Sequence, residues 1–209
     1  MIPSLNFLSI GRNTFSGTAP SELGLLTNSF YISLSNSNLT GIIPTELGLL
    51  TSLSILLLKG NTLEGPIPSE LGLLTNITWA LNLRENQLTG TIPPELGLLK
   101  GLSELELRDN RLTGQIPSEL GLATSMGYFS FANNFLSGSV PHELYSLHDS
   151  LHTLSLEGNP LLSGIIPNAV CEINVTCIGN GYNPCDIPSG FSFNCSSLLC
   201  GCGCNLCIP

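Results

Sequence analysis

The amino-acid sequence predicts an α/β solenoid, in which each turn of the chain adds a short strand to one parallel sheet and a short helical segment to the opposite side. The first observation is a period: the glycine of a T-G-x-I-P-like step recurs at intervals of 24, 24, 25, 24, 24 and 26 residues, at Gly17, Gly41, Gly65, Gly90, Gly114, Gly138 and Gly164. A fixed period in this range is typical of solenoids. The second observation is that all eight cysteines follow residue 170, where the period ends. We therefore expect seven coils over residues 1–170 and a cysteine-rich cap over residues 171–209.

Alternating apolar residues open each coil and predict a strand whose side chains point inward at every second position. The inward columns are Leu8, Ile32, Leu56, Leu81, Leu105, Phe129 and Leu154, followed by Ile10, Leu34, Leu58, Leu83, Leu107, Phe131 and Leu156. A column of asparagines comes next, at Asn13, Asn61, Asn86, Asn110, Asn134 and Asn159, with Ser37 in the second coil. We expect these amides to bond with turn backbone, and the shorter Ser37 to weaken its coil. Replacing the inward Leu107 by alanine should be costly, whereas replacing its outward neighbour Glu106 should cost little.

The second half of each coil predicts a turn followed by a short helix. Pro44-Thr45-Glu46-Leu47 and its relatives suggest proline at the first helical position and glutamate at the third, where a carboxylate meets free backbone amides. This glutamate recurs at Glu22, Glu46, Glu70, Glu95, Glu119 and Glu143. We interpret it as a helix cap rather than a cation site, because no second acidic column completes an all-oxygen calcium site. Extra residues near Thr78-Trp79-Ala80, Asp149-Ser150 and Pro160-Leu161 should form loops.

The repeat pattern, L-x-x-L-x-L-x-x-N-x-L-T-G-x-I-P-x-E-L-G-x-L, is clearest from Leu105 to Gly121. It resembles the plant-type leucine-rich repeat of receptor-kinase ectodomains and polygalacturonase-inhibiting proteins over residues 4–170. The resemblance implies a right-handed leucine-rich-repeat superhelix with a concave parallel β-sheet and short 3-10 or α-helical turns on the convex side. The first coil lacks the cysteine pair and amphipathic helix that cover the leading edge of such proteins. We therefore expect Phe7, Phe15 and Ala19 to be open, and interpret the chain as a fragment or mature piece.

Composition excludes several classes of function. The net charge is −9 and only six residues are Lys or Arg, so no basic patch for a nucleic acid is expected. Apolar runs are far shorter than the roughly 20 residues that span a membrane, so we expect no membrane insertion in this segment. No secretory signal opens the chain. Its cysteines, and N-x-S/T sequons at Asn38, Asn76, Asn174 and Asn194, nevertheless predict a disulfide-bonded glycoprotein, secreted or on the extracellular face of the cell surface.

The tail should be closed by disulfides rather than by a metal. Its cysteines are Cys171, Cys177, Cys185, Cys195, Cys200, Cys202, Cys204 and Cys207. Bonds between cysteines separated by a single glycine would be strained, so we expect more distant partners, while the connectivity stays open. Zinc at Cys202-Gly-Cys204-Asn-Leu-Cys207 is the weaker alternative. This dense tail is loosely similar to that of secreted algal leucine-rich-repeat proteins.

The sequence gives little support for a catalytic site. His142, His148, Asp149, Ser150 and His152 offer the residue types of a nucleophilic triad, but they lie on an inserted turn and at a strand start, where solvated loop residues are the simpler interpretation. The glycines recur with the coil and are explained by turn geometry, which leaves no phosphate loop. We expect neither an enzyme nor a cofactor or metal site.

The outward strand face is where the coils differ, and differing coils suit recognition. Aromatic and apolar residues occupy its first half and mixed charges its centre, and aromatics and arginine are common interface anchors. The predicted partner-binding residues are Phe7, Tyr31, Ile55, Leu57, Trp79, Arg84, Glu104, Glu106, Arg108 and Tyr128. We predict a recognition module for an extracellular protein, peptide or glycan.

Two other functions compete with recognition. The near-identical convex face favours an extracellular scaffold that self-assembles. Ice binding is a third hypothesis, on the column Ser16, Thr40, Glu64, Thr89, Thr113 and Ser137, although Glu64 interrupts it.

Overall fold

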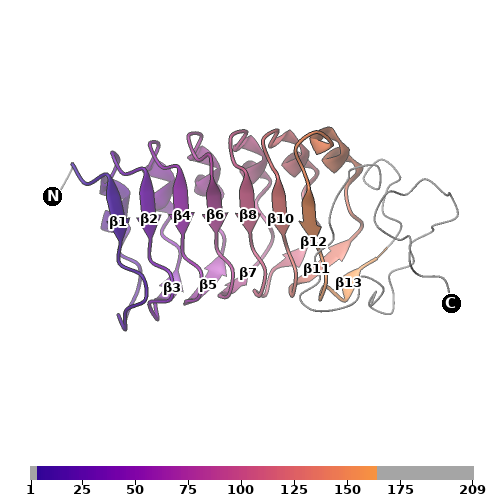
Figure 1. Ribbon diagram of the computed structural model, residues 1–209. Coiled ribbons are helices and arrows are strands. Elements are labelled where there is room, and N and C mark those ends of the chain that lie inside the picture. The colour runs from indigo at the N-terminus through magenta and orange to yellow at the C-terminus, as the bar shows by residue number, and fades with distance from the viewer. Residues whose placement is uncertain (1–3, 164–209) are drawn as a thin grey trace, which may run out of the picture.

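The computed structural model describes residues 4–163, which form seven coils stacked into an elongated solenoid (Figure 1). One strand per coil builds a seven-stranded parallel sheet, in the order β1 (Phe7–Ser9), β2 (Tyr31–Ser33), β4 (Ile55–Leu57), β6 (Ala80–Asn82), β8 (Glu104–Glu106), β10 (Tyr128–Ser130) and β12 (Thr153–Ser155). Leu105 pairs with Leu81 on one side and Phe129 on the other. The predicted strands and their register are therefore confirmed.

The inward columns form the core. Leu105 and Leu107 are fully buried, as are most members of their columns, and each buried leucine contributes roughly 1.5–3 kcal/mol of hydrophobic stabilisation. The first coil is the exception, because no other coil of residues 4–163 packs against its leading side: Phe7 is 52% and Phe15 43% exposed. Ala19, which we expected to be open, is instead buried, since its small inward methyl group joins the same core cluster.

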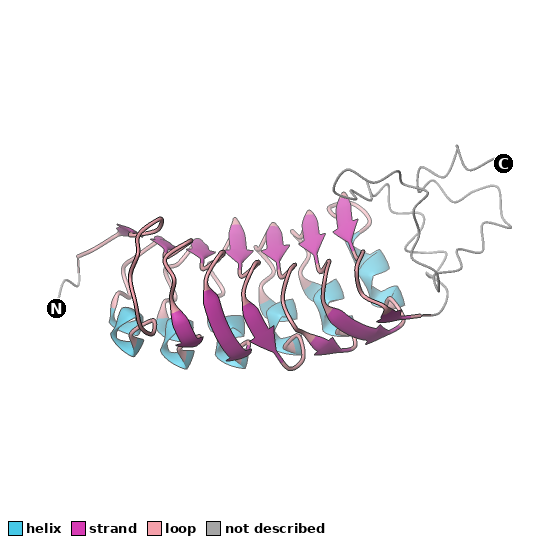
Figure 2. Ribbon diagram, turned by 90° about the horizontal axis from the view of Figure 1, so that it is seen from below, coloured by secondary structure: helices cyan, strands magenta, loops and turns pink. Residues whose placement is uncertain are grey.

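Six 3-10 helices line the side opposite the main sheet (Figure 2). They are η1 (Ser21–Leu25), η2 (Thr45–Leu49), η3 (Ser69–Leu73), η4 (Pro94–Leu98), η5 (Ser118–Leu122) and η6 (His142–Leu147). The predicted capping was wrong in detail. Pro44 precedes η2 in an extended conformation with ψ 132°, Glu46 is the second helical residue, and no side chain caps the helix. A five-residue 3-10 segment closes through the proline carbonyl instead, which accepts the Leu47 N–H at 3.2 Å.

Two glycine columns have different physical causes. The T-G glycines have positive φ angles, for example +76° at Gly114, and so confirm the predicted turn. The glycines of the helical segments do not. A Cβ added to Gly72 would lie 2.6 Å from the backbone oxygen of Glu95 in the next coil, so this column is required by the close stacking of the helices. Our attribution of every glycine to turn geometry was therefore incomplete.

Two further sheets, which we did not predict, follow the turns. One contains β3 (Thr40–Ile42), β5 (Thr62–Pro66) and β7 (Gln87–Thr89), and the other β9 (Thr113–Gly114), β11 (Phe135–Gly138) and β13 (Leu161–Leu162). These strands have two to five residues, and β3, β5, β9 and β11 contain glycine or proline, so their sequence pattern is weak. Their predicted inward leucines, such as Leu63 and Leu88, are buried as expected.

The asparagine column forms the predicted ladder of backbone hydrogen bonds. Asn110 Nδ2 donates to the carbonyls of Leu83, Leu107 and Arg108 at 3.0–3.3 Å, and its Oδ1 accepts the Leu88 N–H at 3.0 Å. Each amide thus ties its own turn to the preceding coil. Ser37 covers part of this role, donating to the carbonyls of Ile10 and Ser35, each at 3.3 Å.

One extra residue lies near Trp79, as predicted: three residues, rather than the usual two, separate the buried Ile77 from Leu81, and Trp79 between them is 68% exposed. Asp149 and Ser150 lie in a turn as expected, whereas Leu161 belongs to strand β13 rather than to a loop. Among residues 4–163, no helix is long and apolar enough to cross a membrane. The predicted cap at 171–209, its eight cysteines, and the sequons at Asn174 and Asn194 lie outside the described residues.

Candidate recognition surface on the concave sheet

An aromatic cluster occupies the amino-terminal end of the concave face. The rings of Phe7 and Tyr31 are stacked, with centroids 4.3 Å apart and planes at 6°. Phe30 adds a tilted contact to Phe7 at 6.2 Å and is 48% exposed. We did not predict Phe30, although it directly precedes β2 as Trp79 precedes β6, so comparison of that column would have found it. The half-buried Ile55 and Leu57 on β4 continue this apolar surface into the third coil.

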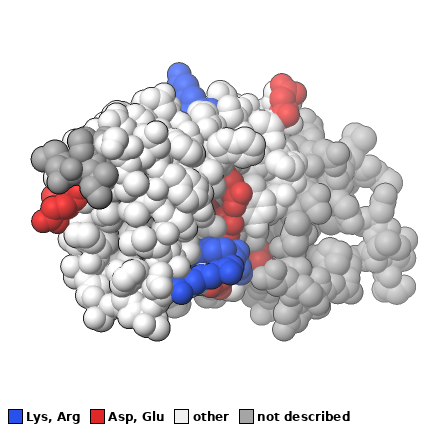
Figure 3. Space-filling model, turned by 60° about the vertical axis from the view of Figure 1, so that its left-hand side comes forward, with Lys and Arg blue, Asp and Glu red and all other residues white. Residues whose placement is uncertain are grey.

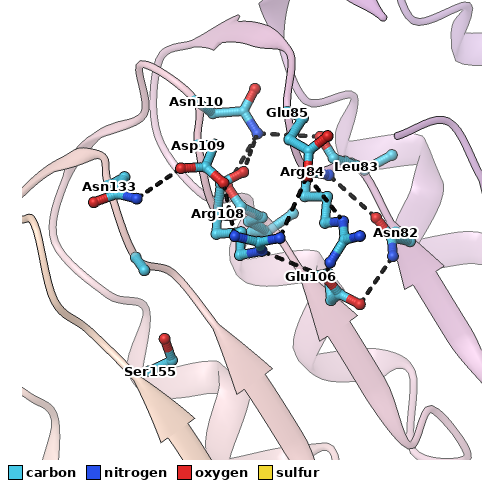
Figure 4. Close-up of polar contacts among 12 residues, drawn as sticks. Asn82, Leu83, Arg84, Glu85, Glu106, Arg108, Asp109, Asn110, Asn133 and Ser155 are labelled. Carbon is cyan, nitrogen blue, oxygen red and sulfur yellow. Dashed lines mark hydrogen bonds and ion pairs between the residues drawn. The ribbon is translucent and has the colours of Figure 1, made fainter. Parts of the chain in front are cut away.

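Mixed charges gather beside the apolar half, on an otherwise largely uncharged face (Figure 3). We call Arg84, Glu85, Glu106, Arg108 and Asp109 the charged cluster (Figure 4). Arg84 lies 3.1 Å from Glu106 and 3.4 Å from Glu85, while Arg108 lies 3.3 Å from Glu85 and 3.0 Å from Asp109. Two arginines from adjacent coils are thus held by three acids, which fixes their guanidinium groups on the concave face.

Glu106 is more deeply embedded than the sequence suggested. Its side chain accepts a hydrogen bond from Asn82 Nδ2 at 2.9 Å as well as the contact from Arg84, and the residue is only 8% exposed. Removing it would leave a buried amide and a half-buried guanidinium without their acceptor. The expectation that Glu106→Ala costs little is therefore revised, and Glu106 becomes a residue that positions Arg84.

Glu85 belongs to the site but was missed from the sequence. It occupies a turn position with φ +56°, as does Asp109 with φ +57°, and this left-handed region is uncommon for glutamate. The conformation directs the Glu85 carboxylate towards both arginines. Asp109 is fixed in turn by Asn133 Nδ2 at 2.6 Å. The signal was available, because Glu85 and Asp109 stand at equivalent positions of neighbouring coils.

Glu104 is the concave carboxyl group with a perturbed titration. A hydrogen bond with the Glu106 carboxyl, then burial, then the Glu106 charge raise the pKa of Glu104 to about 7, against an opposing effect of Arg84 and Lys59. No basic side chain lies within ion-pair distance of Glu104 in the described part of the chain. A negative charge at Glu104 therefore lacks a direct counter-ion.

The strands on either side set the surroundings of Glu104. Ala80, a small residue, pairs with it on β6, and Tyr128 pairs with it on β10. Next to Glu106 on β10, Ser130 is completely buried and its Oγ has no hydrogen-bond partner. The predicted set thus forms one continuous face: aromatic and aliphatic at one end, the charged cluster and Glu104 in the middle, and Tyr128 beyond.

The histidine group does not assemble a catalytic site. His148 Nε2 lies 3.3 Å from Asp149, but the Ser150 hydroxyl donates to the Leu147 carbonyl rather than to a histidine. His152 Nδ1 is 3.2 Å from the Ser150 backbone oxygen. Between residues 4 and 163, no group of three or more His, Cys, Asp or Glu side chains is arranged to hold a metal ion.

The repeats and their geometry define a leucine-rich-repeat solenoid, and comparison with known proteins agrees. The Leucine Rich Repeat family model matches residues 79–99, 101–122 and 150–173. The ectodomain of the receptor kinase GASSHO1/SCHENGEN3 from Arabidopsis thaliana, in complex with CASPARIAN STRIP INTEGRITY FACTOR 2, is 42% identical with a TM-score of 0.80, covering 82% of this chain and 20% of that one. A Pollen Receptor Kinase 3 structure is 31% identical with a TM-score of 0.68, covering 78% of this chain and 76% of that one. The chain belongs to the plant leucine-rich-repeat family.

A third similar structure contains a bound peptide. The Arabidopsis receptor kinase HAESA, in complex with the peptide hormone IDA and the co-receptor SERK1, is 36% identical with a TM-score of 0.76, over 83% of this chain and 28% of that one. The chain therefore spans a fifth of the GASSHO1 structure and just over a quarter of the HAESA structure. A comparison with curated proteins found no match.

The threonine column considered for ice binding lies on the second sheets. Thr40, Thr89 and Thr113 are exposed there, but the equally exposed Glu64 stands between them. A plant ice-binding protein is 27% identical with a TM-score of 0.56, covering 79% of this chain and 67% of that one. The carboxylate of Glu64 therefore interrupts the column of hydroxyl groups.

Proposed function

We propose that this chain is an extracellular recognition module that binds a peptide segment of a partner along its concave sheet. The observation that carries the proposal is the arrangement of side chains on that face: a partly exposed aromatic stack, an aliphatic stretch and fixed arginines follow one another across consecutive coils. Rigid aromatic and arginine groups are the usual anchors of protein interfaces. Two receptor kinases of the same fold have structures in complex with a named ligand, one of them a peptide hormone, which supports the same use here.

The proposed extracellular location also has local support. Asn38 and Asn76 both lie on the surface of the solenoid, where a sequon is accessible to glycosylation. Neither belongs to the strands of the main sheet.

Peptide selection followed by substitution tests the binding surface. A displayed library of random twelve-residue peptides is selected on the chain, and the enriched peptides are synthesised. Tyr31→Ala and Trp79→Ala should each weaken binding at least tenfold, because each removes an aromatic anchor. The control is Leu73→Ala, which removes an exposed apolar side chain on the convex side. Binding that survives the concave changes but is lost with Leu73→Ala would refute the proposal.

Self-association through the convex side is the second candidate function, and one observation favours it. Each of five successive 3-10 helices leaves one leucine half-exposed, between 51% and 55%: Leu25, Leu49, Leu73, Leu98 and Leu122. Contiguous apolar surface of this kind is uncommon on proteins that remain monomeric. Sedimentation velocity over a wide concentration range tests this function. Association should appear in the wild type and vanish in the Leu73→Ser/Leu98→Ser double variant, and a strict monomer would remove the idea.

A further inference from the structure

We propose that the peptide bound by this face carries a lysine or arginine whose cation is received by the carboxyl group of Glu104. This inference rests on the proposed function, because it specifies the chemistry of the ligand for the same surface. Its starting point is the absence of a counter-ion beside Glu104 in a site whose other acids already have partners.

The neighbouring acids are committed to other groups. Glu106 accepts from Asn82 and Arg84, at 2.9 and 3.1 Å. Glu85 and Asp109 bind Arg108, and further along the face Glu157 accepts the Ser155 hydroxyl. Glu104, by contrast, has no cation of the described part of the chain within ion-pair distance, and its hydrogen-bond partner is another carboxyl group, that of Glu106. An incoming ammonium or guanidinium group would supply it.

Space and polarity around Glu104 suit a cationic side chain. Ala80 in register on β6 leaves the surface beside the carboxyl low, and Tyr128 in register on β10 provides an aromatic ring on the other side. A cation beside a carboxylate and over a ring gains from both contacts.

The spacing of the coils restricts the ligand further. Neighbouring strands lie about 4.8 Å apart and an extended peptide advances about 3.3 Å per residue. Three strand spacings separate Glu104 on β8 from Tyr31 on β2, or about 14 Å, which corresponds to about four residues of an extended peptide. Side chains four residues apart lie on the same side of an extended chain. We therefore expect a basic residue with an aromatic residue four positions away.

Electrostatics favour the same class of ligand. The chain has a net charge of −9, which attracts basic peptides at long range. The groups facing Glu104 are Glu106 on its own strand, Arg84 and Lys59 from preceding coils, and Tyr128 from the next. A bound cation stabilises the ionised carboxyl and lowers its pKa, so binding should release a proton. Affinity should be roughly tenfold weaker at pH 6 than at pH 8, where the carboxyl is ionised without the ligand.

The test uses peptides selected from the random twelve-residue library at physiological salt. One enriched basic peptide is compared with an analogue in which norleucine replaces the lysine. Glu104→Gln should weaken binding of the basic peptide at least tenfold and leave the norleucine analogue unaffected. Glu95→Gln makes the same change of charge at an exposed convex position and should alter neither affinity. Thermal unfolding of each variant verifies that it is folded.

The outcomes separate this inference from the proposed function. Peptides that need Tyr31 but bind Glu104→Gln as tightly as wild type would overturn the inference and leave the function standing. The inference alone would also fall if the enriched peptides contain no basic residue, or if the affinity for the basic peptide does not change between pH 6 and pH 8. If no peptide is enriched, or none depends on a concave residue, both fall.

Discussion

Replacing Asn110 by alanine tests what joins one coil to the next. The Asn110 amide accepts from the Leu88 N–H and donates to the carbonyls of Leu83 and Leu107. Each of these two carbonyls also accepts from a second asparagine, Asn86 or Asn134, so each keeps one partner after the change. The Leu88 N–H has no such second partner among the described side chains. The substitution therefore leaves one buried donor unsatisfied and two shared acceptors weakened.

The expected cost follows from that count. An unsatisfied buried N–H costs about 1–3 kcal/mol, and each lost hydrogen bond to a carbonyl that retains another partner costs about 0.5–1 kcal/mol. We expect Asn110→Ala to lower the free energy of unfolding by about 3 kcal/mol, measured by urea denaturation. Hydrogen exchange should locate the effect as lost protection of the Leu88 amide. Because coils are stabilised by their neighbours, protection should also fall in the two adjoining coils.

A matched asparagine provides the control. Asn76 also donates its amide to a backbone carbonyl of the preceding coil, that of Thr51 at 2.6 Å, but it is exposed. Water can replace that bond, so Asn76→Ala should cost well under about 1 kcal/mol. Equal losses for the two variants, or unchanged protection of Leu88 in Asn110→Ala, would refute the reasoning about buried shared acceptors.

Three further predictions concern the core, the charged face and the helix stacking. Leu107→Ala should lower the free energy of unfolding by roughly 2–5 kcal/mol in urea, and Glu106→Ala by roughly 1–3 kcal/mol; a negligible Glu106 effect would contradict its buried role. The pKa of Glu104 is raised from 4.5 to about 7, so protonated Glu104 adds to the free energy of unfolding. This contribution is complete below pH 4.5 and is lost as pH rises through 7; because the side chain is partly solvated, we expect it to be about 1 kcal/mol. Thermal unfolding of Glu104→Gln should lack this pH dependence. Gly72→Ala should cost at least about 1–3 kcal/mol, because its Cβ meets a backbone oxygen at 2.6 Å, whereas Gly101→Ala, with its nearest contacts at 3.3 Å, should be milder; equal melting temperatures would dismiss the stacking argument.

The repeat made the architecture predictable from the sequence. Strand register, core columns and the asparagine ladder all follow from a period that places equivalent residues above one another, so a single coil interpreted correctly determines its neighbours. The errors arose where the backbone, rather than the side-chain pattern, decides the conformation. Pro44 was placed one position too far into its helix, because a 3-10 segment begins through the proline carbonyl. The second sheets went unnoticed because their strands pair through residues such as Gly65 and Pro66.

The site could be predicted only in part, because side chains on one face do not share one environment. The alternation of side chains along a strand places Glu104 and Glu106 on the same face. Glu106, however, accepts a hydrogen bond from Asn82 and lies within ion-pair distance of two arginines, whereas Glu104 has no counter-ion among residues 4–163. That difference comes from the residues of the adjacent coil. Asn82 and Arg84 contact Glu106, whereas Ala80, which pairs with Glu104, has no polar side-chain group that could bind it. Glu85 escaped attention for the related reason that turn positions were treated as structural. Here the turn residue Glu85, in the left-handed conformation, lies within ion-pair distance of both arginines of the concave face. Specificity on this face therefore depends on pairs of residues from the strands and turns of neighbouring coils. A double substitution of Glu85 and Arg108 should lower the free energy of unfolding by less than the sum of the two single substitutions.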